Sequence, residues 1–136
     1  MKKILIAITL FISAFSISAQ TAEPTEDFDT DTPNFKFEEE VIDYGKINKN
    51  TDGNRVFKFV NTGNSPLIIT NAKGSCGCTV PTYNKEPIMP GDSGEIKVKY
   101  ATSRVGRFSK TITLTSNANE PKKVLRIKGE VLKLTE

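Results

Sequence analysis

The strongest constraint on the fold of this chain is the regular alternation of apolar and polar side chains along short segments. In residues 95–100, Ile96, Val98 and Tyr100 fall on one side, whereas two lysines fall on the other. Such alternation is typical of half-buried β-strands, because successive side chains of a strand point to opposite faces. Beyond the N-terminal apolar run, no segment shows a sustained stripe of helical period. The sequence therefore predicts an all-β fold.

Similar runs recur along the chain, with turn-forming residues between them. Besides residues 95–100 they cover residues 35–37, 41–42, 55–60, 67–70, 108–115 and 124–131. Six or seven short strands spaced by about 8–12 residues are typical of a β-sandwich. We therefore expect one sandwich domain of about seven strands over residues 34–133. Its core is expected to contain the large side chains of Phe35, Phe37, Phe57, Phe59, Tyr100 and Phe108.

The composition excludes several kinds of catalytic and metal site. The 136-residue chain contains no histidine, no tryptophan and two cysteines. Without histidine it cannot form a Ser-His-Asp or Cys-His relay, a His-ligated zinc site or a blue-copper site. Two thiolates also fall short of the roughly four that iron–sulfur clusters need. We therefore expect no enzymatic activity, and the cysteines are the only obvious candidates for soft-ligand or redox chemistry.

The first residues have the layout of a secretory signal peptide. Lys2 and Lys3 precede an apolar run over residues 4–17, and Ser18-Ala19 offers a small-residue cleavage site. The run is shorter than the roughly 20 residues that a spanning helix needs, and no later segment is apolar enough to cross a bilayer. We therefore expect residues 1–19 to be removed. The mature protein is expected in the periplasm or outside the cell of a Gram-negative bacterium.

The segment over residues 20–33 is strongly acidic. It carries five carboxylates and no basic residue, has two prolines, and shows no apolar periodicity. This composition predicts a disordered leader ahead of a domain with excess positive charge. The alternative is that the acidic segment folds back on the basic domain. Nucleic-acid binding is not expected, because the mature charge is small and no base-stacking motif is present.

The C-terminal strand is rich in basic side chains, and two interpretations remain open for them. The first is a solvated outer face that also protects a sheet edge, since lysine on an edge discourages strand pairing. The second is contact with an anionic partner. The residues concerned are Lys122, Lys123, Arg126, Lys128 and Lys133.

Five sequence blocks together resemble the exported bacterial proteins of domain-of-unknown-function family 1573. The blocks cover residues 43–47, 57–63 with 66–69, 75–81, 87–94 and 125–131, and the SCGCT block is the most specific of them. The resemblance extends over about residues 35–131. It implies a seven-stranded immunoglobulin-like sandwich, related to domains of the Hydin and major-sperm-protein type, and it implies no established enzymatic activity. One departure is Tyr44, where the family pattern more often has Phe.

The Cys76-Gly77-Cys78 motif is the main chemical question. In an extended strand, alternate Cα atoms lie roughly 6.6–6.8 Å apart, which is near the upper limit of about 6.8 Å for a disulfide. Gly77 can turn the chain and shorten this span. The motif follows the expected strand 67–70 and an expected loop over residues 71–74, so we expect it at a strand end or sheet edge. Its flanking candidates are Lys73, Ser75 and Thr79.

Four interpretations of the cysteine pair stay open. A structural disulfide would close a very short loop and would therefore stabilise the fold little on the loop-length model. A redox-active dithiol is the second, with Lys73 favouring the thiolate. Cu(I) binding is the third, because paired thiolates suit this ion, and Met89 could add a thioether. In the fourth, two reduced cysteines pack as small apolar residues.

Two functional hypotheses follow. The preferred one is a non-enzymatic module of the cell envelope, without a cofactor, that contacts another envelope protein through a sheet face or a free edge strand. The alternative is a periplasmic thiol-redox or Cu(I)-handling protein whose chemistry depends on Cys76 and Cys78.

Overall fold

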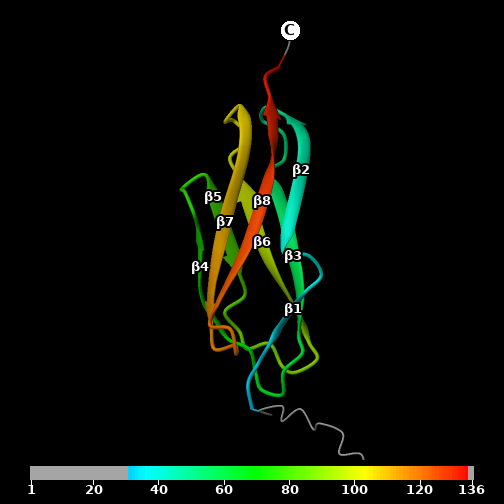
Figure 1. Cartoon of the computed structure of the whole chain (residues 1–136), viewed down its shortest axis with the longest axis vertical. Helices are drawn as coiled ribbons and strands as arrows, with labels where there is room; N and C mark the ends of the chain where they lie inside the picture. The colour runs from blue at the N-terminus through cyan, green and yellow to red at the C-terminus, as the bar shows by residue number, and fades with distance from the viewer. Residues whose placement is uncertain (1–30, 135–136) are drawn as a thin grey trace, which may run out of the picture.

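The computed structural model describes residues 31–134, which form a β-sandwich (Figure 1). The predicted signal peptide and most of the predicted acidic leader lie outside the described residues. Within the described part, no helix is long and apolar enough to cross a membrane. The strands in chain order are β1 (Phe35–Phe37), β2 (Val41–Asn48), β3 (Asn54–Asn61), β4 (Ile69–Gly74), β5 (Thr79–Tyr83), β6 (Ser93–Tyr100), β7 (Gly106–Ser116) and β8 (Lys122–Leu132).

The strands form two sheets of four. Sheet I has the order β1-β3-β6-β5, and sheet II has the order β2-β8-β7-β4. All neighbouring pairs are antiparallel except β2 with β8, which is parallel. Apart from β2, this is the pairing of an immunoglobulin-like sandwich, in which strands A, B, E and D form one sheet and C, F and G the other. The all-β sandwich prediction is confirmed.

The structure has one strand more than the expected seven, because no run was expected over β5. Strand β1 pairs with β3 in sheet I, and the chain then crosses over residues 38–40 to place β2 beside β8 in sheet II. Both of these strands were expected as separate runs, over residues 35–37 and 41–42. The strand that the sequence pattern missed is β5, because its proline and its exposed Val80 and Thr82 give little apolar alternation.

The core lies between the sheets, where the alternating apolar side chains meet. Ile96, Val98 and Tyr100 are buried, as their period-two pattern predicts. Of the six large core candidates, four are buried, whereas Phe35 and Phe37 are only partly buried. These two rings pack on Phe59 at the side of the core, with centroid distances of 5.1 and 5.2 Å.

Two expectations about strand placement are wrong. The segment expected as a loop over residues 71–74 belongs to β4, which begins only at Ile69. Its apolar signal is weak because Ala72 is the one side chain of this segment that packs on the core. The basic C-terminal strand β8 is not an edge strand, since it lies between β2 and β7. Its lysines therefore cannot protect a sheet edge.

One buried polar side chain holds three connecting segments together. Asn61 is fully buried at the end of β3. Its amide donates to the carbonyls of Ser65 (2.8 Å) and Ile88 (2.9 Å). Its carbonyl oxygen accepts from the N–H groups of Asn34 (3.2 Å) and Gly63 (3.0 Å). Two donors and two acceptor sites are the full capacity of an Asn amide, so no polar atom of this side chain is left unsatisfied.

Tyr44, the departure from the family pattern, is buried on β2 and uses its hydroxyl. The Oη atom donates to the carbonyl of Gly53 at 2.8 Å, and the Arg55 guanidinium lies 4.2 Å above the ring centroid. Burial raises the pKa of Tyr44 from 10.0 to about 12, although the nearby positive charge of Arg55 lowers the pKa in part.

We expect this phenol to make the fold sensitive to alkali. Because its pKa is higher in the folded than in the unfolded chain, its contribution to stability is complete below pH 10 and is lost as the pH rises to about 12. The loss amounts to about 2–3 kcal/mol, at about 1.4 kcal/mol per pKa unit. Urea unfolding of the wild type and of Tyr44→Phe between pH 8 and 12 measures it. The variant should lose less stability over this range, and parallel curves would contradict the assignment.

Candidate functional site at the Cys76–Cys78 turn

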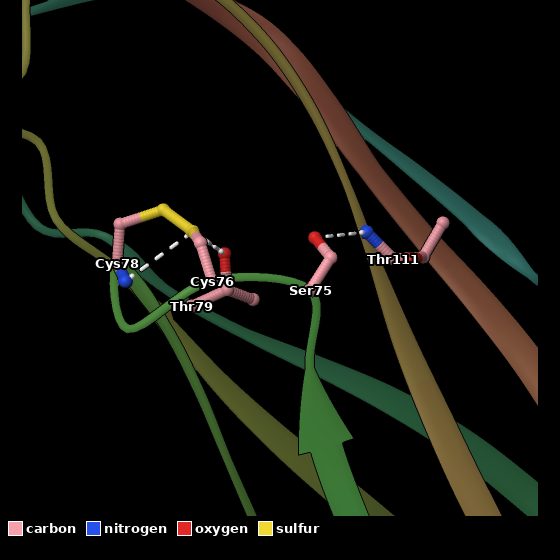
Figure 2. Close-up of a disulfide and its surroundings, with 5 residues drawn as sticks. All are labelled: Ser75, Cys76, Cys78, Thr79 and Thr111. Atoms are coloured by element: carbon pink, nitrogen blue, oxygen red, sulfur yellow. Dashed lines mark hydrogen bonds between the residues drawn. A yellow bond between two sulfur atoms is a disulfide. The ribbon is translucent and has the colours of Figure 1, made fainter.

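The two cysteines lie in the turn that joins the sheets at one side of the sandwich. Strand β4 is the edge of sheet II and β5 the edge of sheet I, and residues 75–78 connect them. Figure 2 shows the cysteines at the bend of this turn, joined by a disulfide. Their Cα atoms are 5.2 Å apart, closer than in an extended strand, because the chain folds back so that Thr79 N–H donates to the Cys76 carbonyl. The pair therefore lies at a strand end, as expected.

Backbone contacts hold the turn in place independently of the sulfur atoms. Ser75 N–H donates to the Thr111 carbonyl at 2.8 Å, and Thr111 N–H donates to Ser75 Oγ at 3.2 Å (Figure 2). On the other side, Ala101 N–H donates to the Cys78 carbonyl at 2.9 Å. The turn is thus fastened to β7 in sheet II and to the segment after β6 in sheet I.

The two sulfur atoms have different surroundings. Cys78 is 6% exposed and belongs to the buried core, whereas Cys76 is only partly buried. The N–H of Cys78 points to Cys76 Sγ at 3.3 Å (Figure 2). The Thr79 hydroxyl lies 3.8 Å from each sulfur. The pair therefore has an outer sulfur that receives an N–H and an inner sulfur that packs on the core.

The other candidates contribute less than the sequence suggested. Lys73 is exposed on β4, and no hydrogen bond or ion pair of the described residues joins it to the cysteines. A Cβ on Gly77 would meet nothing within 4 Å, and its φ is not positive, so the turn does not require glycine there. Gly74 is the restrictive glycine, because a Cβ on it would collide with the Thr79 carbonyl.

A Cu(I) or zinc site would have few ligands in this part of the chain. In the described range, 31–134, no three or more His, Cys, Asp or Glu side chains gather in a way that could hold a metal ion. Met89 is 50% exposed in the connection between β5 and β6. The turn therefore offers two thiolates to an ion, fewer than the four ligands of a structural zinc site.

A cavity of about 410 Å³ is lined by residues of β3, β5, β6 and the β5–β6 connection, together with Ile69 of β4, and none of the expected site residues lines it. Near it, Tyr83 Oη on β5 donates to the Thr70 carbonyl on β4 at 2.9 Å and so links the two edge strands. No sequence pattern indicated this cavity, because its lining comes from separate segments of the chain. The lining residues are Phe59, Ile69, Thr82, Tyr83, Asn84, Ile88, Ser93, Gly94, Glu95 and Lys97.

The outer face of sheet I carries an excess of lysines, and we call it the lysine face. The register places Val56 beside Lys97 and Val80 beside Lys99. The two valines are 37% and 55% exposed. Among the described residues none of the lysines of this face forms an ion pair, whereas on sheet II two of the outward basic residues do. The charged residues of the lysine face are Lys36, Lys58, Glu95, Lys97 and Lys99.

The strand order places the chain in the class of immunoglobulin-like β-sandwiches. The sequence has no histidine for a histidine-dependent catalytic site. Within this class the chain belongs to the DUF1573 family, described as "Protein of unknown function (DUF1573)", whose model matches residues 35–131. The resemblance drawn from the sequence blocks is thereby confirmed. No curated protein matches the chain by sequence.

Solved structures of low sequence identity share the fold. A protein of unknown function from Porphyromonas gingivalis W83 has a TM-score of 0.65 at 15% identity, covering 74% of this chain and 48% of that one. The VesB protease of Vibrio cholerae has 0.57 at 15% identity, covering 74% and 32%. The PapD-like domain 7 of human CEP192 has 0.61 at 6% identity, covering 76% and 89%. The chain thus spans about half of the first of these proteins and a third of the second, and the likeness concerns the fold alone.

Proposed function

We propose that this protein is an exported, non-enzymatic module of the bacterial cell envelope that binds another envelope protein through the lysine face. The observation that carries the proposal is the unpaired charge of that face. Four lysines and one glutamate lie around exposed Val56 and Val80, and none of the lysines forms an ion pair among the described residues. Glu95 lies opposite Lys58 in the register, but positive charge is in excess around the exposed valines. Such a surface suits a partner surface of opposite charge.

The edge strands are less suited to binding by strand addition. Next to the cysteine turn, the Thr79 carbonyl lies against Gly74 of β4. Farther along the same two strands, the Tyr83 hydroxyl donates a hydrogen bond to the Thr70 carbonyl. Pro81 lies on β5 and lacks an N–H, a common means of protecting an edge. On the far side, β2 is interrupted by a register shift between Asp43 and Lys46. A sheet face is therefore the better candidate for the contact than an edge.

Charge reversal tests the proposal. The full chain and the variant Lys97→Glu/Lys99→Glu are used to capture partners from envelope extracts at two salt concentrations. A salt-sensitive partner should be recovered at least about tenfold less with the variant, because like charges would face each other in the contact. The intact mass of the exported chain, with Gln20 as first residue, tests export in the same preparation.

The matched control changes the same number of charges on sheet II. Lys122→Glu/Arg126→Glu alters two exposed residues of β8 and should keep the partner. Equal recovery by both variants, or loss only with the β8 variant, would overturn the assignment to the lysine face. Circular dichroism confirms that both variants are folded.

A further inference from the structure

We infer that the Cys76–Cys78 pair is a thiol–disulfide exchange site in which Cys76 is the exchanging cysteine and Cys78 the resolving one. The expected substrate is a dithiol or disulfide of another protein. This inference does not depend on the lysine face, and either could fail without the other.

The geometry first separates the roles by access. A thiolate must reach one sulfur along the S–S axis, so the accessible sulfur is attacked preferentially. Cys76 is partly exposed at the bend of the turn, whereas Cys78 is 6% exposed and packs in the core. A mixed disulfide with a partner protein can therefore form at Cys76 with much less disturbance than at Cys78.

The hydrogen bonds separate the roles in the same direction. Cys78 N–H points to Cys76 Sγ at 3.3 Å, and such a donor favours the thiolate over the thiol. Cys78 is a buried member of the core, whereas Cys76 packs against the core only in part. The Thr79 hydroxyl lies 3.8 Å from both sulfur atoms and therefore does not separate them. The negative charge of the reduced pair is thus better accommodated on Cys76, which makes it the nucleophile.

The turn can open its disulfide without losing its shape. No sulfur atom takes part in the hydrogen bonds that hold the turn. These bonds run from Ser75 to β7, from Thr79 N–H to the Cys76 carbonyl, and from Ala101 N–H to the Cys78 carbonyl. The cysteines are two positions apart, so the bridge constrains very little of the unfolded chain. Both redox states can therefore share one backbone arrangement, with the two sulfur atoms held ready to rejoin.

In the reducing direction, a dithiol of the partner protein supplies the two electrons and two protons that the Cys76–Cys78 disulfide takes up. A partner thiolate attacks Cys76 Sγ, the bond to Cys78 breaks, and Cys78 leaves with the electron pair and takes up a proton. The second partner thiolate then attacks the partner sulfur of the mixed disulfide and releases the Cys76 thiolate, which is protonated in turn. Two electrons and two protons pass to the pair, and the partner becomes a disulfide. The reverse reaction begins with the Cys76 thiolate attacking a partner disulfide.

Two single variants with oxidised glutathione as the probe test this assignment. Cys78→Ser leaves the outer thiol and Cys76→Ser the inner one, and intact mass follows the glutathione adduct with time. We expect Cys78→Ser to form the adduct at least about tenfold faster, since access and thiolate character both favour Cys76. Equal rates, or faster reaction of Cys76→Ser, would overturn the assignment.

A measurement on the wild type avoids any effect of the substitutions on folding. The protein is equilibrated in a buffer of reduced and oxidised glutathione and pulsed with iodoacetamide, and the labelled cysteine is located by peptide mass. We expect the pair to interconvert between disulfide and dithiol, with Cys76 labelled first. A pair that stays fully oxidised at every glutathione ratio, or labelling of Cys78 first, would overturn the inference.

Discussion

Asn61→Ala is expected to lower the free energy of unfolding by about 3–5 kcal/mol, because it removes four hydrogen bonds from a buried position. The Ile88 carbonyl keeps the N–H of Leu67, whereas the Ser65 carbonyl and the N–H groups of Asn34 and Gly63 lose the amide. The amide joins the carbonyls of Ser65 and Ile88 to the N–H groups of Asn34 and Gly63, so it connects the entry to β1, the β3–β4 connection and the β5–β6 connection. Urea unfolding followed by circular dichroism gives the value.

A neighbouring asparagine supplies the control for this variant. Asn64→Ala changes the same side chain at an exposed position of the β3–β4 connection and should alter stability by less than about 0.5 kcal/mol. Asn61→Asp keeps the acceptor oxygens but loses the donor, and it places a carboxylate against two carbonyls. We expect it to be at least as destabilising as the alanine variant. A loss below about 1 kcal/mol for Asn61→Ala would mean that solvent replaces the amide.

Phe59→Ala is expected to cost about 3–5 kcal/mol, the usual range for removing a buried phenyl ring. The ring is buried between the sheets and contacts the rings of Phe35 and Phe37. It also lies over Gly94, where an added Cβ would collide with it. Its removal therefore leaves a space that the rigid neighbours fill only in part, next to the cavity it already lines.

The control for Phe59 lies three positions earlier on the same strand. Val56→Ala truncates a side chain that is 37% exposed on the outer face, and it should cost less than about 1 kcal/mol. Similar losses for the two variants would show that the inner face of sheet I contributes no more to stability than the outer one.

The sequence was sufficient where structure follows from a local pattern. Alternation over residues 95–100 predicted the buried positions of β6, because the period of a strand is fixed by backbone geometry. It was insufficient for residues 71–74 of β4, where Ala72 is the one side chain that packs on the core and gives little apolar contrast. Strand β5 also escaped notice, because Thr79–Tyr83 contains a proline and two exposed side chains and therefore shows little apolar alternation.

The sequence predicted which residues form the site, but not the difference in burial between the two cysteines. The spacing of the cysteines located the turn and the possibility of a bridge, yet the difference between the two sulfur atoms depends on the core that Cys78 packs against. Asn61 was expected only as part of a turn, because its partners are distant in sequence. The pairing of charges on sheet II, and its lack on the lysine face, likewise depends on strand register.

We expect packing and the Asn61 hydrogen bonds to hold the sandwich without the disulfide, which leaves the Cys76–Cys78 turn available for exchange chemistry. The most direct measurement is urea unfolding of the wild-type protein in its oxidised and fully reduced states. We expect the reduced protein to be folded, with a free energy of unfolding lower by no more than about 1.5 kcal/mol, as the loop-length relation gives for so short a loop. A reduced protein that is unfolded, or that loses about 3 kcal/mol or more, would contradict this expectation.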